Sequence, residues 1–201
     1  MKHDEKNLIV ENVLSEEEMA EVYRIIEKPN NTYLMKLFTQ TIVDFNLPPN
    51  IHKKIIDYSE NISGESDLEI AEYQFARYRN TFDEESNTMF RPNLTPHCDL
   101  TFKEPRFTFD YQLGGNTTWD LVVEEKEFTL VNNSALTFSG THQVHWRKHK
   151  AFQDHEYVDM IFFHLKKKNS KEYSEEHSSS MEAKVKLYSD IYNQEIDNDK
   201  N

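Results

Sequence analysis

The sequence predicts a mixed α+β protein with a β-sandwich or jelly roll behind an N-terminal helical segment. Two observations lead to this fold class. Apolar residues in the first 65 positions repeat at helical spacing, whereas from Glu69 to Leu165 they alternate in short segments separated by turns. We expect a single domain over residues 1–201, with helical support over about 1–65, a jelly-roll core over about 66–166 and a polar tail over 167–201.

The first helix has a defined start. Ser15 is a favoured N-cap residue, and Glu18 completes a capping box three residues later, while Pro29 marks the end of the helical pattern. We expect further helices over residues 33–45 and 51–58, and a short strand over residues 7–13. A last amphipathic helix is predicted over residues 181–192, followed by a disordered end.

The clearest strand pattern covers residues 106–113, where apolar and polar residues alternate. The apolar face holds Phe107, Phe109, Tyr111 and Leu113. The polar face holds Arg106, Thr108, Asp110 and Gln112. A turn is expected at Gly114-Gly115-Asn116, and further strands over residues 70–78, 119–123, 128–131, 135–138, 143–147 and 157–165. The polar face of 106–113 is a candidate lining for a site.

Charge and cysteine content narrow the functional class. The net charge of −13 over 201 residues disfavours nucleic acids and anionic membranes as partners. Cys98 is the single cysteine, which favours a reducing, cytoplasmic location. Because no apolar run approaches the length of a membrane span, we expect no membrane segment, and the charged N-terminus does not resemble a signal peptide.

The segment Pro96-His97-Cys98-Asp99 carries the strongest chemical signal. In a strand, residues i and i+2 point to the same side, so His97 and Asp99 can reach one ion. Two histidines and one carboxylate on one face of an octahedron form the triad that non-haem Fe(II) oxygenases use. His-x-Asp alone is a weak motif, and its functional interpretation requires a second histidine from elsewhere in the fold.

Two histidines compete for that third position, His142 and His145. Gly140 suits a turn into the next strand, which places His145 inside the strand, and we favour His145. His142 would then contact the site indirectly or touch the substrate. The remaining histidines of this half are interpreted as loop or strand-face residues: His149, His155 and His164.

These residues resemble the Fe(II)/2-oxoglutarate-dependent dioxygenase superfamily, in particular its prolyl-hydroxylase-like branch. The resemblance covers about half the chain, from Glu69 to Leu165, and includes the His97-to-Asp99 motif, the strand from Arg106 and the segment Ala135–Gly140 leading to His145. It implies a double-stranded β-helix (a jelly roll) with N-terminal supporting helices, and Fe(II) held by His97, Asp99 and His145.

The resemblance also implies 2-oxoglutarate as co-substrate, but one feature departs from the family. Most members carry Arg or Lys about ten residues after the distal histidine, where this chain has residues 155–159 without either. A guanidinium is the best partner for a carboxylate. We expect Arg147, on the face of His145, to take this role, followed by Arg106, beside Thr108 on the same polar face.

Other groups remain possible anchors for the co-substrate. The earlier strand offers Arg77 and Arg79, and two tyrosines could donate a hydroxyl group to a carboxylate, Tyr78 and Tyr111. As buried aromatic residues, the tyrosines are more often part of a core.

By resemblance, the expected reaction uses dioxygen and converts 2-oxoglutarate to succinate and CO2 while a substrate is hydroxylated. Asp99 argues against a halogenating member, in which a small residue replaces the carboxylate. The leading substrate is an amino-acid side chain, peptidyl or free, and another small metabolite is the alternative. A cupin-like enzyme and a non-catalytic jelly-roll binding protein stay open, although the His-x-His pattern of cupins is absent. The sequence does not indicate an oligomeric state.

Overall fold

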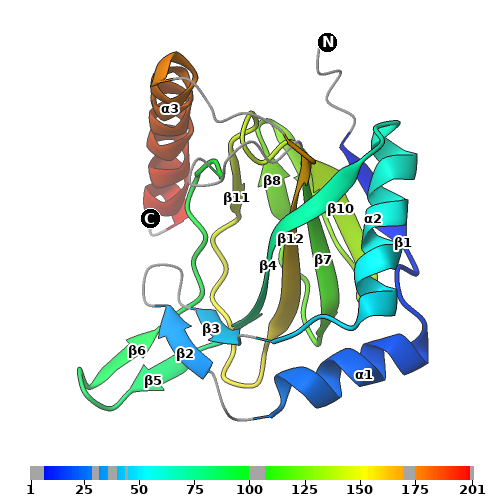
Figure 1. Ribbon diagram of the computed structural model, residues 1–201. Coiled ribbons are helices and arrows are strands. Elements are labelled where there is room, and N and C mark those ends of the chain that lie inside the picture. The colour runs from blue at the N-terminus through cyan, green and yellow to red at the C-terminus, as the bar shows by residue number, and fades with distance from the viewer. Residues whose placement is uncertain are drawn as a thin grey trace.

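The computed structural model describes residues 7–28, 32–35, 40–43, 45–99, 107–169 and 175–199. Its main feature is a seven-stranded sheet with the order β1-β10-β7-β12-β4-β3-β2, in which every neighbouring pair is antiparallel (Figure 1). The strands are β1 (Leu8–Glu11), β2 (Thr32–Met35), β3 (Gln40–Val43), β4 (Leu68–Tyr78), β7 (Phe107–Gly115), β10 (Ser134–Phe138) and β12 (Val158–Lys167).

A smaller sheet faces the inner side of this large sheet. It has the order β11-β8-β9, with β8 (Leu121–Val123), β9 (Lys126–Phe128) and β11 (His145–Arg147). An apolar cluster joins the two, because Tyr78 and Met160 of the large sheet pack with Leu121 and Val123 of the small one. A separate hairpin of β5 (Thr81–Asp83) and β6 (Thr88–Phe90) extends from the body (Figure 1).

Two helices cover the outer side of the large sheet, α1 (Glu16–Ile26) and α2 (Pro49–Ser63) (Figure 1). The predicted capping box is present at α1: the Glu18 N–H donates to Ser15 Oγ at 3.3 Å, and the Ser15 N–H donates to Glu18 Oε2 at 2.7 Å. Apolar residues of both helices, such as Val22 and Ile55, pack against Phe109 of β7. The helices therefore support the sheet from outside and leave its inner side for the site.

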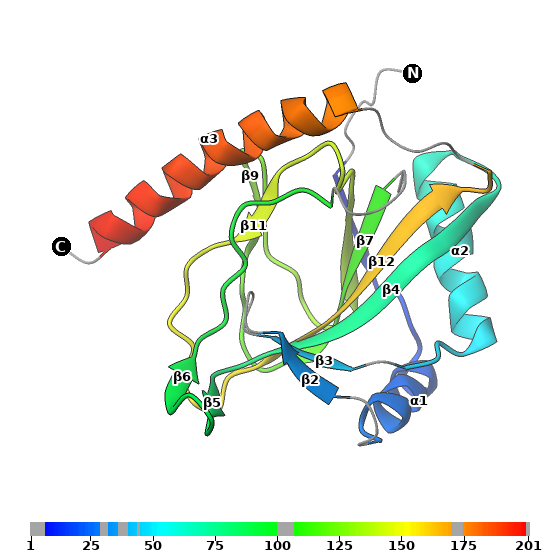
Figure 2. The ribbon, with the colours of Figure 1, turned by 60° about the vertical axis from the view of Figure 1, so that its left-hand side comes forward.

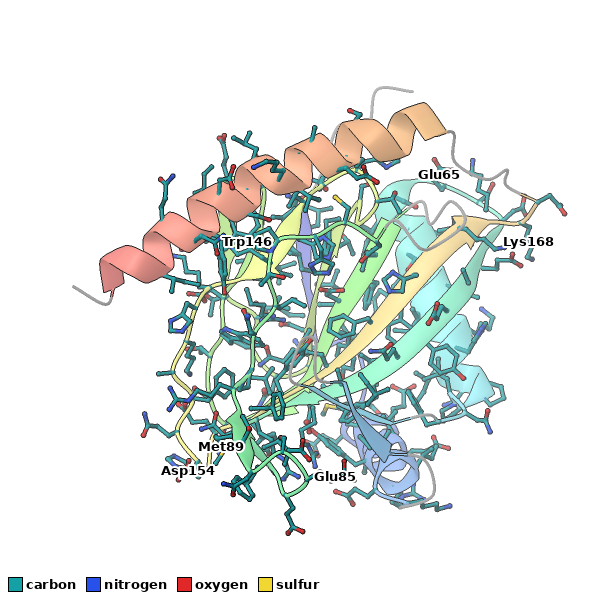
Figure 3. All side chains as sticks on the ribbon, turned by 90° about the vertical axis from the view of Figure 1, so that its left-hand side faces the viewer. Glu65, Glu85, Met89, Trp146, Asp154 and Lys168 are labelled. Atoms are coloured by element: carbon teal, nitrogen blue, oxygen red, sulfur yellow. The ribbon has the colours of Figure 1, made fainter. Side chains whose placement is uncertain are left out.

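The third helix, α3 (Glu175–Asp199), lies across the outer side of the small sheet (Figure 2). Trp146 of β11 points toward it (Figure 3), and the rings of Trp146 and Tyr188 lie 5.2 Å apart. Met181 and Tyr192 complete this cluster. The predicted last helix is thus confirmed, but it is longer than expected and extends from Glu175 to Asp199. Among the described residues, no helix is both long and apolar enough to cross a membrane.

Three details of the secondary-structure prediction are wrong. The helix over residues 33–45 is replaced by β2 and β3, because the edge of β4 is completed by pairing with β3. The turn at Gly114-Gly115 is part of β7, since Val158 pairs with Gly115. The strand over residues 128–131 is displaced, with β9 ending at Phe128. The first 65 residues therefore supply strands β1 to β3 as well as helices.

Candidate metal centre

Backbone pairing brings the His-x-Asp segment onto the strand that carries His145. The N–H of His97 donates to the carbonyl of His145 at 3.1 Å, and the N–H of His145 donates back at 3.0 Å. Two residues further along, the Asp99 N–H donates to the Gly140 carbonyl at 2.8 Å. These hydrogen bonds hold the two segments in register. As a result, the side chains of His97, Asp99 and His145 converge on one site.

The ligand atoms of these three side chains all lie within 4.8 Å of one another. Asp99 Oδ1 is 3.6 Å from His145 Nε2 and 4.0 Å from His97 Nε2. With bonds of about 2.1 Å, an octahedral ion separates neighbouring ligands by about 3 Å and opposite ones by about 4.2 Å. The observed distances are longer than the roughly 3 Å between neighbouring ligands, so the three side chains would have to move slightly closer together to bind one ion.

Both histidines present the same ring nitrogen to this point. His97 Nδ1 lies 2.8 Å from the Thr95 carbonyl, and His145 Nδ1 lies 3.1 Å from the Gln143 carbonyl. A carbonyl oxygen can only accept, so each Nδ1 carries a proton, and Nε2 is the ring nitrogen that each histidine turns toward Asp99. Backbone carbonyls commonly orient metal-binding histidines in this way.

Asp99 is buried and ionised. Burial raises its pKa, but His145, His164 and His97, together with the hydroxyl of Thr108, hold the pKa below its ordinary value. Thr108 Oγ1 donates to Asp99 Oδ2 at 2.9 Å, which leaves Oδ1 directed at the histidines. The predicted polar strand face thus contributes Thr108 as a residue that orients the carboxylate.

The two candidate histidines for the third position, His142 and His145, have different surroundings. His145 is 4% exposed, and burial lowers its pKa to about 4, so the imidazole is neutral and able to bind a metal at neutral pH. His142 instead directs Nδ1 at Ser139 Oγ (2.9 Å) and Thr141 Oγ1 (3.0 Å). His142 is not part of the group that could hold an ion.

Sequence reasoning missed two neighbours of this centre. His164, interpreted as a strand-face residue, has its Nδ1 3.5 Å from Asp99 Oδ2. Its place follows from the β7–β12 register, in which His164 is paired with Thr108. Gly140, interpreted as a turn residue, is needed for space, because a Cβ there would lie 1.9 Å from Asp99 Oδ2 and 2.3 Å from Thr108 Oγ1.

A second set of polar residues, around Arg147, lies in the interior between the two sheets. Arg147 is fully buried; its Nη1 donates to the Trp119 carbonyl and its Nη2 to the sulfur of Met160 at 3.3 Å. The buried polar atoms that find no hydrogen-bond partner within the part of the chain that the structure describes include Arg147 Nε, Tyr78 Oη and Asp110 Oδ1. Leaving such groups unpaired is costly, and this arrangement is typical of a site that takes a polar ligand.

The other predicted anchors are engaged elsewhere or exposed. Arg77 pairs with the buried Asp159 through two bonds of 2.7 Å, and Tyr111 donates to Asn133 at 3.0 Å. Arg79 is exposed. Arg106 lies outside the described residues. Of the candidate cations, the structure places Arg147 alone among those described inside the space between the sheets.

No family model matches the sequence, and no curated protein is similar to it in sequence. Solved structures, in contrast, share its fold. A 2OG-Fe(II) oxygenase family oxidoreductase from Burkholderia pseudomallei is 10% identical, with 84% of this chain and 88% of that chain covered and a TM-score of 0.58. The non-haem alpha-ketoglutarate-dependent epimerase SnoN from nogalamycin biosynthesis is 16% identical over 81% of this chain and 78% of that chain, with a TM-score of 0.62.

A prolyl-4-hydroxylase from Pseudomonas putida is also similar, at 11% identity over 83% of this chain and 95% of that chain, with a TM-score of 0.55. At such identities the similarity is one of fold. The chain therefore has the fold found in 2-oxoglutarate/Fe(II) oxygenases, as the residues around His97 predicted, with mixed helices and antiparallel sheets.

Proposed function

We propose that the protein is an Fe(II)- and 2-oxoglutarate-dependent dioxygenase built on a double-stranded β-helix core. The observation that carries this proposal is the convergence of His97, Asp99 and His145, with ligand atoms within 4.8 Å of one another, inside this fold. Two imidazoles and one carboxylate leave half of an octahedral coordination sphere for co-substrate and dioxygen.

The protein's own contribution at the metal is orientation. The carbonyls of Thr95 and Gln143 fix the two imidazole rings, and Thr108 fixes the carboxylate of Asp99. The low exposure of His145 and Asp99 keeps bulk water from these ligands. When bound, iron and co-substrate supply the oxidation of a substrate C–H bond, with 2-oxoglutarate converted to succinate and CO2.

Arg147 and Tyr78 are the residues that would bind the tail carboxylate of 2-oxoglutarate. Arg147 lies two residues after His145 on β11, and two residues of a strand span about 6.6 Å. A five-carbon dicarboxylate has a similar length. The unpaired Nε of Arg147 and hydroxyl of Tyr78 offer donors to it, so the interior fits the co-substrate. The more usual position of this cation, near the start of β12, holds Asp159, which is paired with Arg77.

For the substrate we propose an amino-acid side chain, peptidyl or free, that is hydroxylated. The fold similarity to a prolyl-4-hydroxylase supports this choice, and the similarity to the epimerase SnoN keeps another small metabolite as the alternative. Both rest on fold analogy, so the substrate must be found by screening.

Succinate formation tests the proposed reaction. Protein reconstituted with Fe(II) in air should convert 2-oxoglutarate to succinate, slowly alone and faster with a true substrate from a panel of peptides and amino acids. Asp99→Ala and His145→Ala should abolish this conversion, whereas His142→Ala should retain most of it. Equal succinate formation by the Asp99→Ala variant would exclude the assigned metal site.

A further inference from the structure

Asp110 is a buried carboxyl group on the inner side of β7, and the role proposed for it rests on the function proposed above. We propose that Asp110 takes up a proton when 2-oxoglutarate binds and donates the resulting O–H to the tail carboxylate of the co-substrate, beside Arg147 and Tyr78. The proton comes from solvent, and no covalent bond other than this O–H is formed or broken.

The position of Asp110 follows from strand register. It is paired with Leu136 on β10 and with Phe162 on β12, and it follows Thr108 by two residues on the same face. Thr108 contacts the metal ligand Asp99, so Asp110 lies one step further inside the core than the metal layer. Only 2% of the residue is exposed, and its Oδ1 finds no partner among the described residues.

Arg147 does not neutralise this carboxyl group directly. The two side chains influence each other electrostatically, but no ion pair within 4.0 Å joins them in the described part of the chain. Instead, the guanidinium donates to a carbonyl and to the weak acceptor sulfur of Met160. Because Asp110 and Arg147 face the same interior without touching, a ligand can bind between them.

The charges of the loaded site favour a neutral Asp110. The formal charges of Fe(II), ionised Asp99, Arg147 and dianionic 2-oxoglutarate cancel, so an ionised Asp110 would leave one uncompensated negative charge in a buried site. Without 2-oxoglutarate the same site is positive, and an ionised Asp110 is favoured. Binding of the dianion should therefore draw a proton onto Asp110.

Protonation of Asp110 is already favoured in the protein without ligands. Burial raises the pKa of Asp110 well above its ordinary value, and Asp99 raises it further, while Arg147 opposes the shift. β10 contributes the uncharged Leu136 beside it. Among the described residues, the titratable or charged groups around this interior are His97, Asp99, His164 on β12, Tyr78 on β4, and His145 and Arg147 on β11.

Calorimetry of 2-oxoglutarate binding to the Mn(II)-loaded full chain tests this inference without turnover. Titrations at about pH 8 in buffers of different ionisation enthalpy should show uptake of close to one proton per 2-oxoglutarate, and the Kd should rise about tenfold per pH unit above the pKa of Asp110 in the metal-loaded protein. Asp110→Asn keeps a hydrogen-bond donor, so it should bind without proton uptake and with a Kd that is flat with pH. Asp110→Leu should bind at least about tenfold more weakly at low pH, because the donor is lost.

Asp154→Asn is the matched control, since it makes the same change at an exposed position of the loop between β11 and β12 (Figure 3) and should keep the proton uptake. Absence of proton uptake by the wild-type protein, or its persistence in Asp110→Asn, overturns the inference. Tighter binding by Asp110→Asn at low pH, where the wild-type carboxyl group is already protonated, also overturns it, because the O–H of Asp110 would then not help to hold the co-substrate. If the wild-type protein binds no 2-oxoglutarate at any pH, the proposed function fails as well; binding without proton uptake refutes the role of Asp110 alone.

Discussion

Replacing Gly140 by alanine should destroy the metal site while leaving the fold intact. The added Cβ would lie 1.9 Å from Asp99 Oδ2, whereas real Cβ contacts are essentially never shorter than 3.0 Å, so the carboxylate must retreat by about 1.1 Å. The backbone cannot absorb this shift easily, because the Asp99 N–H donates to the Gly140 carbonyl at 2.8 Å. Movement of the Asp99 carboxylate would also disrupt its hydrogen bond from Thr108 Oγ1. That Oγ1 would itself lie 2.3 Å from the new methyl group.

The size of the effect follows from the strictness of metal geometry. Ligand distances at a working site vary by about 0.2 Å, far less than the required displacement. We expect the affinity for Mn(II) or Fe(II) to fall at least about a hundredfold, the upper end of losses from residues that merely support a ligand. The methyl group should cost about 1–3 kcal/mol of stability through overpacking.

Metal affinity is best measured by competition with a fluorescent chelator, next to urea unfolding of the metal-free protein. Gly64→Ala is the matched control: no atom lies within 4 Å of a Cβ there, but the φ of +68° makes alanine strained. That variant should lose about 1 kcal/mol of stability and keep its metal affinity. A folded Gly140→Ala protein that binds metal within about threefold of wild type, a change of under 1 kcal/mol, would refute the crowding described here.

Further predictions concern ion pairing, protonation and helix packing. Arg77→Met should lower the free energy of unfolding in urea by about 3 kcal/mol, because it leaves the buried Asp159 without its cationic partner. The affinity for 2-oxoglutarate should stay unchanged. A loss of affinity without a loss of stability would instead make Arg77 the anchor. Burial lowers the pKa of His145 to about 4 in the folded chain, whereas an ordinary histidine has a pKa of 6.5. The unfolded chain therefore takes up a proton that the folded chain does not, and metal-free stability should fall by about 2 kcal/mol between pH 7 and 5. The same unfolding experiment on His145→Gln should lack this decrease, and an equal decrease would contradict the pKa. Tyr188→Ala should cost about 1–2 kcal/mol and change the fluorescence of Trp146, and unaltered emission would argue against α3 packing on β11.

Features that depend on neighbours in sequence were predictable. The capping box of Ser15 and Glu18 needs only a three-residue spacing, and it is present. Strand alternation predicted that His97 and Asp99 point to one side and that Arg147 shares the side of His145; in the structure the ligand atoms of His97, Asp99 and His145 lie together, and Arg147 is fully buried. The turn at Gly140 and the strand that carries His145 after it were likewise predictable, whereas the choice of His145 over His142 as a metal ligand stays a prediction.

Features that depend on register between distant strands were not predictable. His164 reaches Asp99 because β12 pairs with β7, and a single sequence contains no direct record of that pairing. Residues 33–45 have a pattern that also suits a helix, but pairing of β3 with the edge of β4 decides for strands. The crowding at Gly140 appears only when Asp99 and Thr108 are brought against it.

Anaerobic absorption spectroscopy tests the central proposal most directly. When Fe(II) and then 2-oxoglutarate are added without oxygen, chelation of iron by the keto acid should produce a weak charge-transfer band in the visible range. The wild-type protein should show this band, His145→Ala should not, and Arg147→Met should need more 2-oxoglutarate to reach it. A folded wild-type protein that shows no band at saturating iron and 2-oxoglutarate would contradict the assignment of His97, Asp99 and His145 as the iron site of an oxygenase.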